Sequence, residues 1–406
     1  MTDIFDVAVV GGGPVGACAG TLLARDGLKV CVLEPNRPAP PIPESAIDAR
    51  VVAVSRSSER ILDTAGAWQR ILGPRVKPYE RMRIWHETVS ASSADALVFD
   101  AADVGEPNLG YIIENRLLQT ALLDEFETTG GFIRQSGVRD LSIEPEWVAI
   151  GTGDGPIRAR LLIGADGARS AVRELVGLTA EVRDYDETAI VATINTQRPH
   201  ESTAWQRFMR DGTLAFLPCA DGSCSIVWSA DNSLAGALLE MPVSDFEREL
   251  DRASDHVLGA TRLVSERLPF PLRQLGAHRY VAHRCALIGD AAHVVHPLAG
   301  QGVNLGFMDA AVIAELVLES RQEREDPGAL RVLRRYERWR KGHNLLMMGA
   351  MDGFKRLFGS DAEPLRWARN AGLSLADRLV PLKILIMRHA MGRAGDLPDL
   401  ARVVRR

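Results

Sequence analysis

Three glycines near the start of the chain have the spacing of a phosphate-binding turn. Gly11, Gly13 and Gly16 form the pattern Gly-x-Gly-x-x-Gly. Such glycines allow a tight bend and a close approach of the backbone to a pyrophosphate, whose charge the following helix N-terminus attracts. Glu34 stands about 20 residues further on, where a carboxylate can hold an adenosine ribose. The pattern predicts a bound dinucleotide and does not by itself separate FAD from NAD.

Two further stretches carry residues that could complete such a site. In residues 161–170 an apolar run ends at Asp166, and Ser170 can cap a following helix, although a simple capped turn has the same pattern. Residues 289–306 place Asp290 at the end of a short apolar run, followed by a glycine-dense loop. A carboxylate there can hold ribityl hydroxyls, and the loop backbone can approach a flat, negatively charged ring. This stretch therefore favours a ring-bearing cofactor.

Other reactive side chains have simpler explanations. His293 and His296 lack the intervening glutamate of a His-Glu-x-x-His metal motif, and Pro297 interrupts the helix that such a pair needs. We therefore expect no metal site and assign these histidines to shaping the loop, with proton transfer as the alternative. Cys219 and Cys224 lack Cys-x-x-Cys spacing, so we expect them to be packing residues.

The elements that position these residues follow from the apolar pattern. Residues 6–10 and 29–34 are strand-like and flank the helix-forming residues 17–26, which together make a βαβ unit. The proline-rich stretch 35–43 is interpreted as a surface loop rather than a linker, because helix-like sequence begins again at Ser55.

The middle of the chain predicts an antiparallel sheet, and the end predicts helices. Two Asp-Gly pairs separate three strand-like segments, as expected for hairpins. The pairs are Asp211-Gly212 and Asp221-Gly222, and the segments are 205–209, 213–217 and 224–228. A short buried strand is expected at 286–288, and the chain beyond residue 303 is mainly helical in pattern.

Length and composition limit the class of protein. The chain has 406 residues, 46% of them hydrophobic and 25% charged, with a formal net charge of −5. These values suit two or three globular domains and argue against a nucleic-acid binder. Five scattered cysteines predict reduced thiols in a cytoplasmic protein. Acidic residues at the start argue against a secretion signal, and no apolar run is long enough for a transmembrane helix, so only peripheral membrane contact stays open.

The three motifs, in this order and spacing, resemble the class A flavoprotein monooxygenases, which have the para-hydroxybenzoate hydroxylase-like fold. Finer motifs resemble the ubiquinone-biosynthesis hydroxylases of the UbiH/UbiF/VisC family, and residues 307–311 most resemble its VisC (UbiI) branch. These finer motifs lie at residues 48–55, 110–119, 297–306 and 369–378. One departure is Val294, where the family often has threonine.

The resemblance implies an α/β fold with a Rossmann-like FAD domain, an inserted mixed β-sheet substrate domain and a helical C-terminal region. The expected limits are 1–180 for the first part of the FAD domain, 181–272 for the substrate sheet, 273–345 for the return of the FAD domain and 346–406 for the helical region. Strands near residues 80–110 are expected to join the substrate sheet.

The resemblance also implies which residues contact the cofactor. Glu34 would hold the adenosine ribose, Asp166 would lie near the pyrophosphate, and Asp290 would hold the ribityl chain. The full predicted cofactor-binding set is Gly11, Gly13, Gly16, Glu34, Arg50, Arg116, Gln119, Asp166, Gly289, Asp290, Pro297, Gly300, Gly302, Val303 and Asn304. No catalytic acid or base is assigned, and the candidates expected to border the flavin are His296, Pro297, Gly300 and Gln301.

The activity implied by the resemblance is that of an oxidoreductase, a flavoprotein hydroxylase. Noncovalent FAD, reduced by NAD(P)H, would react with O2 to a C4a-hydroperoxide and hydroxylate a polyprenylphenol of ubiquinone biosynthesis, at ring C5. The other expected partners are a ubiquinone-biosynthesis complex and, through the apolar and basic residues 379–389, a membrane surface, but no nucleic acid. Two alternatives stay open: a flavin-dependent reductase or dehydrogenase of a polyprenyl substrate, and a non-catalytic flavoprotein of the complex.

Overall fold

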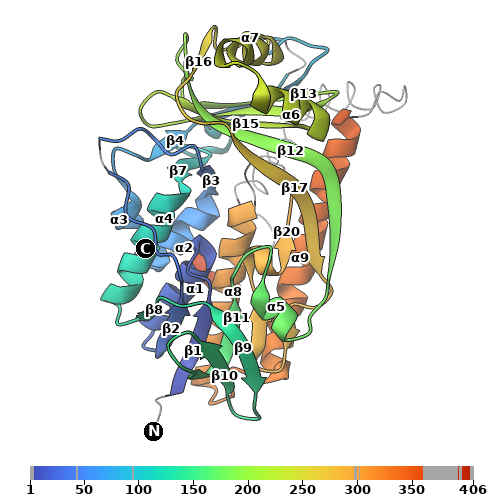
Figure 1. Ribbon diagram of the computed structural model, residues 1–406. Coiled ribbons are helices and arrows are strands. Elements are labelled where there is room, and N and C mark those ends of the chain that lie inside the picture. Colours follow the sequence, from blue (N-terminus) through green and yellow to red (C-terminus); the bar gives the residue numbers. More distant parts are fainter. Residues whose placement is uncertain are drawn as a thin grey trace.

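The computed structural model describes residues 4–42, 44–93, 96–296, 300, 302–359, 392 and 396–402. Two large sheets and one small sheet are joined by helices, and the long strand β12 (Ala180–Thr196) arches along one side (Figure 1). This arrangement confirms the predicted α/β fold with a second, mixed sheet. The apolar and basic segment 379–389 lies outside the described residues.

The first large sheet carries the glycine-rich turn at the end of its central strand. Its parallel strands, in spatial order, are β19 (Cys285–Leu287), β11 (Ile157–Gly164), β1 (Ile4–Val10), β2 (Val30–Leu33) and β8 (Phe132–Arg134). The antiparallel strands β18 (Val281–Ala282), β10 (Val148–Thr152) and β9 (Val138–Ile143) extend it. Because β1, β11 and β19 are parallel neighbours, the three chemical motifs that follow them meet at one edge.

Helices cover this sheet and form most of the core with it. α1 (Pro14–Arg25) packs against α4 (Asn115–Thr128) and α8 (Gly302–Gln322), and α9 (Leu330–Gly359) packs against α8. α1 starts with a proline, which needs no N–H in the first turn, and ends before Gly27, whose φ is +79°. Shorter helices include α2 (Arg56–Thr64), α3 (Trp68–Ile71) and the 3-10 turns Ala101–Val104 and Asp399–Ala401.

A small antiparallel sheet lies beside the glycine-rich turn. Its strands are β3 (Val51–Ser55), β7 (Gly110–Glu114) and β4 (Lys77–Tyr79). β7 leads directly into α4, and β3 leads into α2, whose N-terminus is capped by the Ser55 side chain. This sheet therefore brings the motifs at 48–55 and 110–119 together.

The second large sheet combines strands from distant parts of the chain. In spatial order it contains β20 (His293–Val294), β17 (Leu268–Ala277), β12, β15 (Cys224–Asp231), β14 (Gly212–Pro218), β13 (Thr203–Met209), β5 (Arg81–His86) and β6 (Leu97–Asp100), with β16 (Thr261–Leu263) beside β12. Both predicted hairpins are present. β13 and β5 pair in parallel, although β5 precedes β7 in the sequence and β13 follows β12.

The two faces of this sheet have different neighbours. α6 (Asn232–Glu240) and α7 (Val243–Ala253) cover one face, where Ile190, Ile194 and Trp228 pack with Phe246 (Figure 1). The other face meets the first domain, since Ser225 Oγ donates a hydrogen bond of 2.9 Å to the carbonyl of Ala49.

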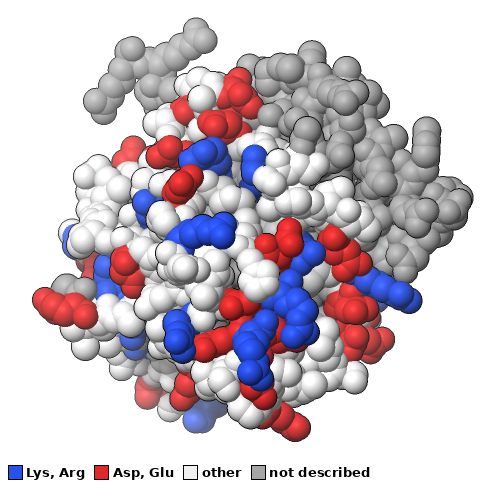
Figure 2. Space-filling view, turned by 90° about the horizontal axis from the view of Figure 1, so that it is seen from above, with Lys and Arg blue, Asp and Glu red and all other residues white. Residues whose placement is uncertain are grey.

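Charge on the outer side of the second sheet is mixed. Figure 2 shows basic and acidic side chains interspersed on the face seen from above, over α6 and α7. On α7, Arg248 pairs with Asp245 and Arg252 pairs with Glu249, both at 2.6 Å. The visible face therefore lacks the single-sign field of a nucleic-acid surface among the residues described.

Candidate functional site

The three glycines of the first motif have distinct structural roles. Gly11 has φ +101°, and a Cβ there would lie 2.4 Å from the carbonyl oxygen of Ala165. A Cβ on Gly16 would lie 2.0 Å from the carbonyl oxygen of Gly11. A Cβ on Gly13 would meet nothing within 4 Å, and φ is −62° there. Gly11 and Gly16 thus allow close packing, whereas Gly13 faces open space at the N-terminus of α1.

Side chains from two other elements hold this turn. The Glu34 carboxylate accepts hydrogen bonds of 2.8 Å from the backbone N–H of Gly12 and of Asn36. Gln119, at the start of α4, donates from Nε2 to the Gly12 carbonyl at 3.0 Å. Both predicted cofactor-binding residues therefore lie at the glycine-rich turn, and both fix its backbone.

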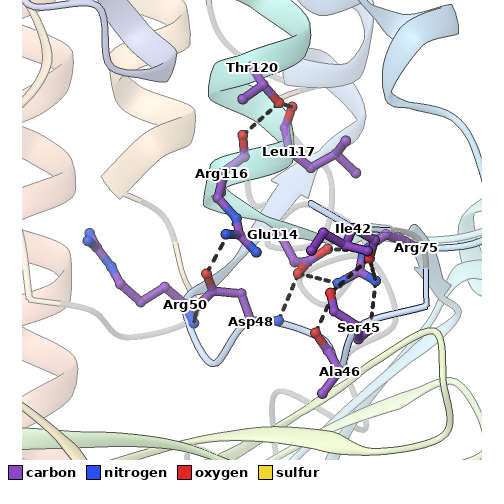
Figure 3. Close-up of polar contacts among 10 residues, drawn as sticks. All are labelled: Ile42, Ser45, Ala46, Asp48, Arg50, Arg75, Glu114, Arg116, Leu117 and Thr120. Carbon is purple, nitrogen blue, oxygen red and sulfur yellow. Dashed lines mark hydrogen bonds and ion pairs between the residues drawn. The ribbon is translucent and has the colours of Figure 1, made fainter. Parts of the chain in front are cut away.

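Arg116 and Arg50 both contact the Asp48 carboxylate, Arg116 through its side chain and Arg50 through its backbone. Arg116 Nε is 3.9 Å from Asp48 Oδ2, and the Arg50 N–H donates to Asp48 Oδ1 at 3.0 Å. The Arg50 side chain extends away from this cluster (Figure 3), and its guanidinium carbon lies 5.4 Å from the ring centroid of Phe270 on β17. Arg50 thus reaches from the small sheet to the second large sheet.

A buried ion pair supports the loop that carries Asp48 and Arg50 (Figure 3). Arg75 Nε and Nη2 each donate to the fully buried Glu114 carboxylate at 2.7 Å, and the Asp48 N–H donates to Glu114 Oε1 at 2.7 Å. Arg75 also donates to the carbonyl of Ser45 at 2.8 Å. Glu114 lies in the motif at residues 110–119, but no sequence pattern indicates Arg75 as its partner.

The second motif caps a short helix and is tied to the third. Asp166 accepts hydrogen bonds from Ser170 Oγ at 2.5 Å and Val172 N–H at 3.0 Å, at the start of α5 (Ala171–Leu175). The buried Arg173 donates to the carbonyls of Ala168 and Ala291, both at 2.9 Å. The Asp166 carboxylate is thus used locally, while its backbone lies beside Gly11.

Asp290 lies in the 3-10 turn Gly289–Ala291, directly after β19. The residue as a whole is exposed to solvent, whereas its carboxyl group is surrounded by protein atoms. This burial raises the pKa of Asp290 above its ordinary value, and the charges of His293 and Arg50 partly oppose the rise. The electrostatic influence of Arg50 links the small sheet to the third motif.

Asn304 fixes the start of α8. Its side chain accepts hydrogen bonds from the Ser55 N–H at 2.9 Å and from Ser58 Oγ at 2.8 Å. It donates to the carbonyls of Ala53 at 2.9 Å and Gly300 at 3.3 Å. The N-terminus of α8, which begins at Gly302 and Val303, is therefore locked to β3 and α2. Pro297 and Gln301, also predicted at this site, lie outside the described residues.

The two histidines of the third motif have separate carboxylate partners. His293 pairs with the buried Asp309 of α8, which also accepts hydrogen bonds from Arg340 at 2.6 Å. His296 pairs with Glu187 of β12. No sequence pattern indicates these partners, because each lies in an element distant along the chain from its histidine.

The alternative metal and thiol sites gain no support. Within the described ranges no group of histidine, cysteine, aspartate and glutamate is arranged to hold a metal ion. All five cysteines are buried and unpaired, and burial raises the pKa of Cys219 to about 12 and that of Cys224 further. Cys219 and Cys224 therefore lie where packing residues are expected, buried and outside any disulfide.

Comparisons with known proteins cover almost the whole chain. A family model described as FAD binding domain matches residues 4–345. The chain is 37% identical over 405 residues to the ubiquinone hydroxylase UbiL of Rhodospirillum rubrum, covering 99% of this chain and 93% of that relative. It is 35% identical over 400 residues to the 3-demethoxyubiquinol 3-hydroxylase of Escherichia coli, covering 95% and 98%.

A human protein and a solved structure are also similar to the chain. The chain is 34% identical over 439 residues to the human mitochondrial ubiquinone biosynthesis monooxygenase COQ6, covering 95% of this chain and 92% of that relative. The crystal structure of p-nitrophenol 4-monooxygenase PnpA from Pseudomonas putida superposes with a TM-score of 0.76 at 20% identity, covering 98% of this chain and 100% of that one. This last likeness concerns the fold. No helix among the described residues has the length and apolarity needed to cross a bilayer.

Proposed function

This chain belongs to the FAD-binding domain family and, within it, to the ubiquinone-biosynthesis hydroxylases, and on that premise we propose that it hydroxylates a polyprenylphenol of ubiquinone biosynthesis at ring C5. It is an FAD-dependent monooxygenase. The single observation that supports this proposal best is that Gly13 and Asp290, which follow the parallel strands β1 and β19, lie at one edge of the first sheet, where Gln119 hydrogen-bonds the glycine-rich turn.

The residues at this edge fit FAD. The open space at Gly13 suits a pyrophosphate facing the α1 N-terminus, and Glu34 stands at the adenosine end. Arg116 and Arg50 supply positive charge beside it, and Asp290 would hold the ribityl chain. When bound, the noncovalent flavin would supply the redox chemistry, taking electrons from NAD(P)H and delivering one oxygen atom of O2 to the ring.

The protein would provide position, dryness and charge. The N-terminus of α8, locked by Asn304, would direct its positive dipole end at negative charge on the flavin ring. The inner face of the second sheet would exclude water from the reacting ring. Three small apolar side chains lie directly across neighbouring strands on that face: Val191, Val227 and Ala215.

The substrate class follows from the family and this apolar face. A prenylated phenol needs apolar surface for its tail, and its insolubility requires delivery from a membrane or from a biosynthetic complex. We assign the membrane contact to residues 379–389. Ring C5 is assigned by the VisC-like residues 302–311, whereas the name of the E. coli relative specifies position 3. We assign the FAD domain to residues 1–180 and 273–345, the substrate sheet to 181–272 with β5 and β6, and the helical region to 346–406.

The proposal is tested with the purified, FAD-loaded protein. NAD(P)H and O2 consumption are measured with 2-prenylphenol, a phenol with one isoprene unit, and the products are identified by mass spectrometry. The proposal expects one oxygen atom from O2 in the ring. Reduction of the flavin with no ring oxygenation would indicate a reductase, and no NAD(P)H-driven reduction with any phenol would indicate a non-catalytic flavoprotein.

A further inference from the structure

A bulge in β12 turns one carboxylate toward the flavin-side loop. The register between β12 and β17 shifts between Asp184 and Glu187, and Asp186 has φ +55°. Such bulges re-aim side chains and are frequent next to active sites. Beyond the bulge, Ile190 packs on the α6–α7 side, so the alternation of side chains puts Glu187 and Ala189 on the opposite, inner face.

Glu187 meets His296 on this inner face. Glu187 Oε2 lies 3.4 Å from His296 Nε2, and the Tyr185 ring approaches the imidazole edge-on with centroids 5.0 Å apart. An ionised carboxylate only accepts hydrogen bonds, so in a neutral imidazole this contact places the proton on Nε2 and leaves a lone pair on Nδ1. Apo geometry of this length commonly tightens when a ligand binds.

The lone pair on His296 Nδ1 has no protein partner in the part of the chain described. The imidazole is 1% exposed, and Nδ1 is buried without a hydrogen bond. Buried acceptors are nearly always satisfied, because leaving one unpaired costs free energy. An O–H donor from a bound molecule would satisfy this one.

The position of this acceptor connects it to the predicted flavin site. Ala189, on the same face as Glu187, pairs directly with Phe270 of β17. The Arg50 guanidinium lies over that Phe270 ring, and its charge acts on Asp290. The His296 acceptor therefore lies on the side of the sheet that faces the proposed ribityl and ring end of the cofactor.

We propose that His296 Nδ1 accepts a hydrogen bond from the phenolic hydroxyl of the substrate, with Glu187 as the positioning residue that fixes the imidazole tautomer. This inference rests on the proposed function and deepens it. The hydrogen bond restricts the substrate to rings whose free hydroxyl can reach His296 Nδ1, and it discriminates against the corresponding ethers.

The test uses FAD-loaded protein and two probes, 2-prenylphenol and its methyl ether. Their dissociation constants are measured from the change in flavin absorbance and by calorimetry. The wild-type protein should bind the phenol about tenfold more tightly than the ether, the ratio expected for one hydrogen bond. His296→Gln keeps a polar group near the Nε2 position and removes Nδ1, so the ratio should fall to about one.

Further variants separate a positioning role of Glu187 from a general loss of structure. Glu187→Gln can donate to Nε2 and so favours the tautomer with a proton on Nδ1, which should lower the phenol-to-ether ratio and leave ether binding unchanged. Asp186→Asn makes the same change of carboxylate to amide one residue away and should leave both dissociation constants unchanged. His296→Asn, whose amide oxygen comes near the Nδ1 position, should restore part of the preference.

Three results would overturn the inference. The first is equal binding of phenol and ether by the wild type. The second is an unchanged phenol-to-ether ratio in His296→Gln. The third is loss of FAD affinity in His296→Gln with that ratio retained, which would assign Nδ1 to the flavin. If His296→Gln loses FAD entirely, the inference is tested by the phenol-to-ether binding ratios of Glu187→Gln and His296→Asn. Unchanged ratios in both variants would then overturn it. A wild-type protein that hydroxylates phenols but does not prefer them over ethers refutes only this inference, whereas one that binds neither probe refutes the proposed function as well.

Discussion

His293 Nε2 lies 2.5 Å from Asp309 Oδ2, and both side chains are buried. The same carboxylate accepts hydrogen bonds from the Gly289 N–H at 3.1 Å and from Asn344 Nδ2 at 3.2 Å, besides Arg340. One buried anion therefore joins the turn that carries Asp290 to both long helices, α8 and α9. Burial alone would raise the pKa of Asp309, but His293 and Arg340 outweigh it and hold that pKa well below its ordinary value.

Asp309→Asn should strongly destabilise the protein. The variant leaves Arg340 and His293 buried without their anion, and breaking a buried pair in this way costs about 3–5 kcal/mol. The free energy of unfolding is measured in denaturant at pH 7. Asp184→Asn, which removes the exposed pair with Arg273, should cost less than about 1 kcal/mol. Equal losses in the two variants would contradict the role given to Asp309.

The same carboxylate predicts a direction for acid sensitivity. The folded-state pKa of Asp309 is lowered, so its contribution to stability is present above the unfolded pKa of about 3.9 and is lost as pH falls through the folded value. The stability difference between wild type and Asp309→Asn should therefore shrink below about pH 4. A difference that grows on acidification would contradict the lowered pKa.

The same substitution should affect folding at Gly16 and cofactor binding at Gly13. Gly16→Val places its Cβ against the Gly11 carbonyl and should prevent stable folding, as measured by circular dichroism and thermal unfolding. Gly13→Val enters open space at an ordinary φ, so the protein should fold but lose FAD binding, measured by flavin fluorescence titration. Full FAD occupancy in Gly13→Val would show that the pyrophosphate lies elsewhere.

The local signals in the sequence predicted the glycine-rich turn, Glu34 and the helix that begins near Ser55, because each depends on residues close together in one βαβ unit or helix start. The partners Arg75–Glu114, Asp309–Arg340 and Glu187–His296 depend on the tertiary fold. Their residue types are common in exposed positions, and no periodicity distinguishes a buried charge from a solvated one. The membrane prediction for residues 379–389 lies outside the described residues and stays a prediction.

Asp290→Ala should weaken FAD binding by about 1.5–3 kcal/mol, roughly 10- to 150-fold, through loss of a charge-assisted hydrogen bond. The raised pKa of Asp290 adds a pH signature. Wild-type affinity should fall as acidification protonates the carboxylate, beginning at a higher pH than an ordinary aspartate would give. Asp290→Asn should bind FAD weakly without that dependence. Identical pH profiles for Asp290→Asn and wild type would contradict the assignment.

Deleting residues 379–389 should reduce membrane binding while leaving FAD binding intact, because the buried Ala401 and the hydrogen bond from Thr64 to the Leu400 carbonyl are kept. The segment combines apolar residues with Lys383 and Arg388, which suits an interface with anionic head groups. Co-sedimentation with vesicles of phosphatidylglycerol and phosphatidylethanolamine measures the effect at low and moderate salt. The variant Lys383→Glu/Arg388→Glu should lose binding in the same way. Unchanged sedimentation of both variants would assign delivery of the substrate to another surface.

Complementation with quinone analysis tests the proposed ubiquinone hydroxylation most directly. The gene is expressed in bacterial strains that each lack one ubiquinone ring hydroxylase, and the extracted quinones are identified by mass spectrometry. We predict that it restores ubiquinone in the strain that lacks the C5 hydroxylase, and that Gly13→Val fails to do so. Rescue of only the C1 or C6 hydroxylase strain would contradict the ring position, and rescue of none would contradict the proposed place in ubiquinone biosynthesis.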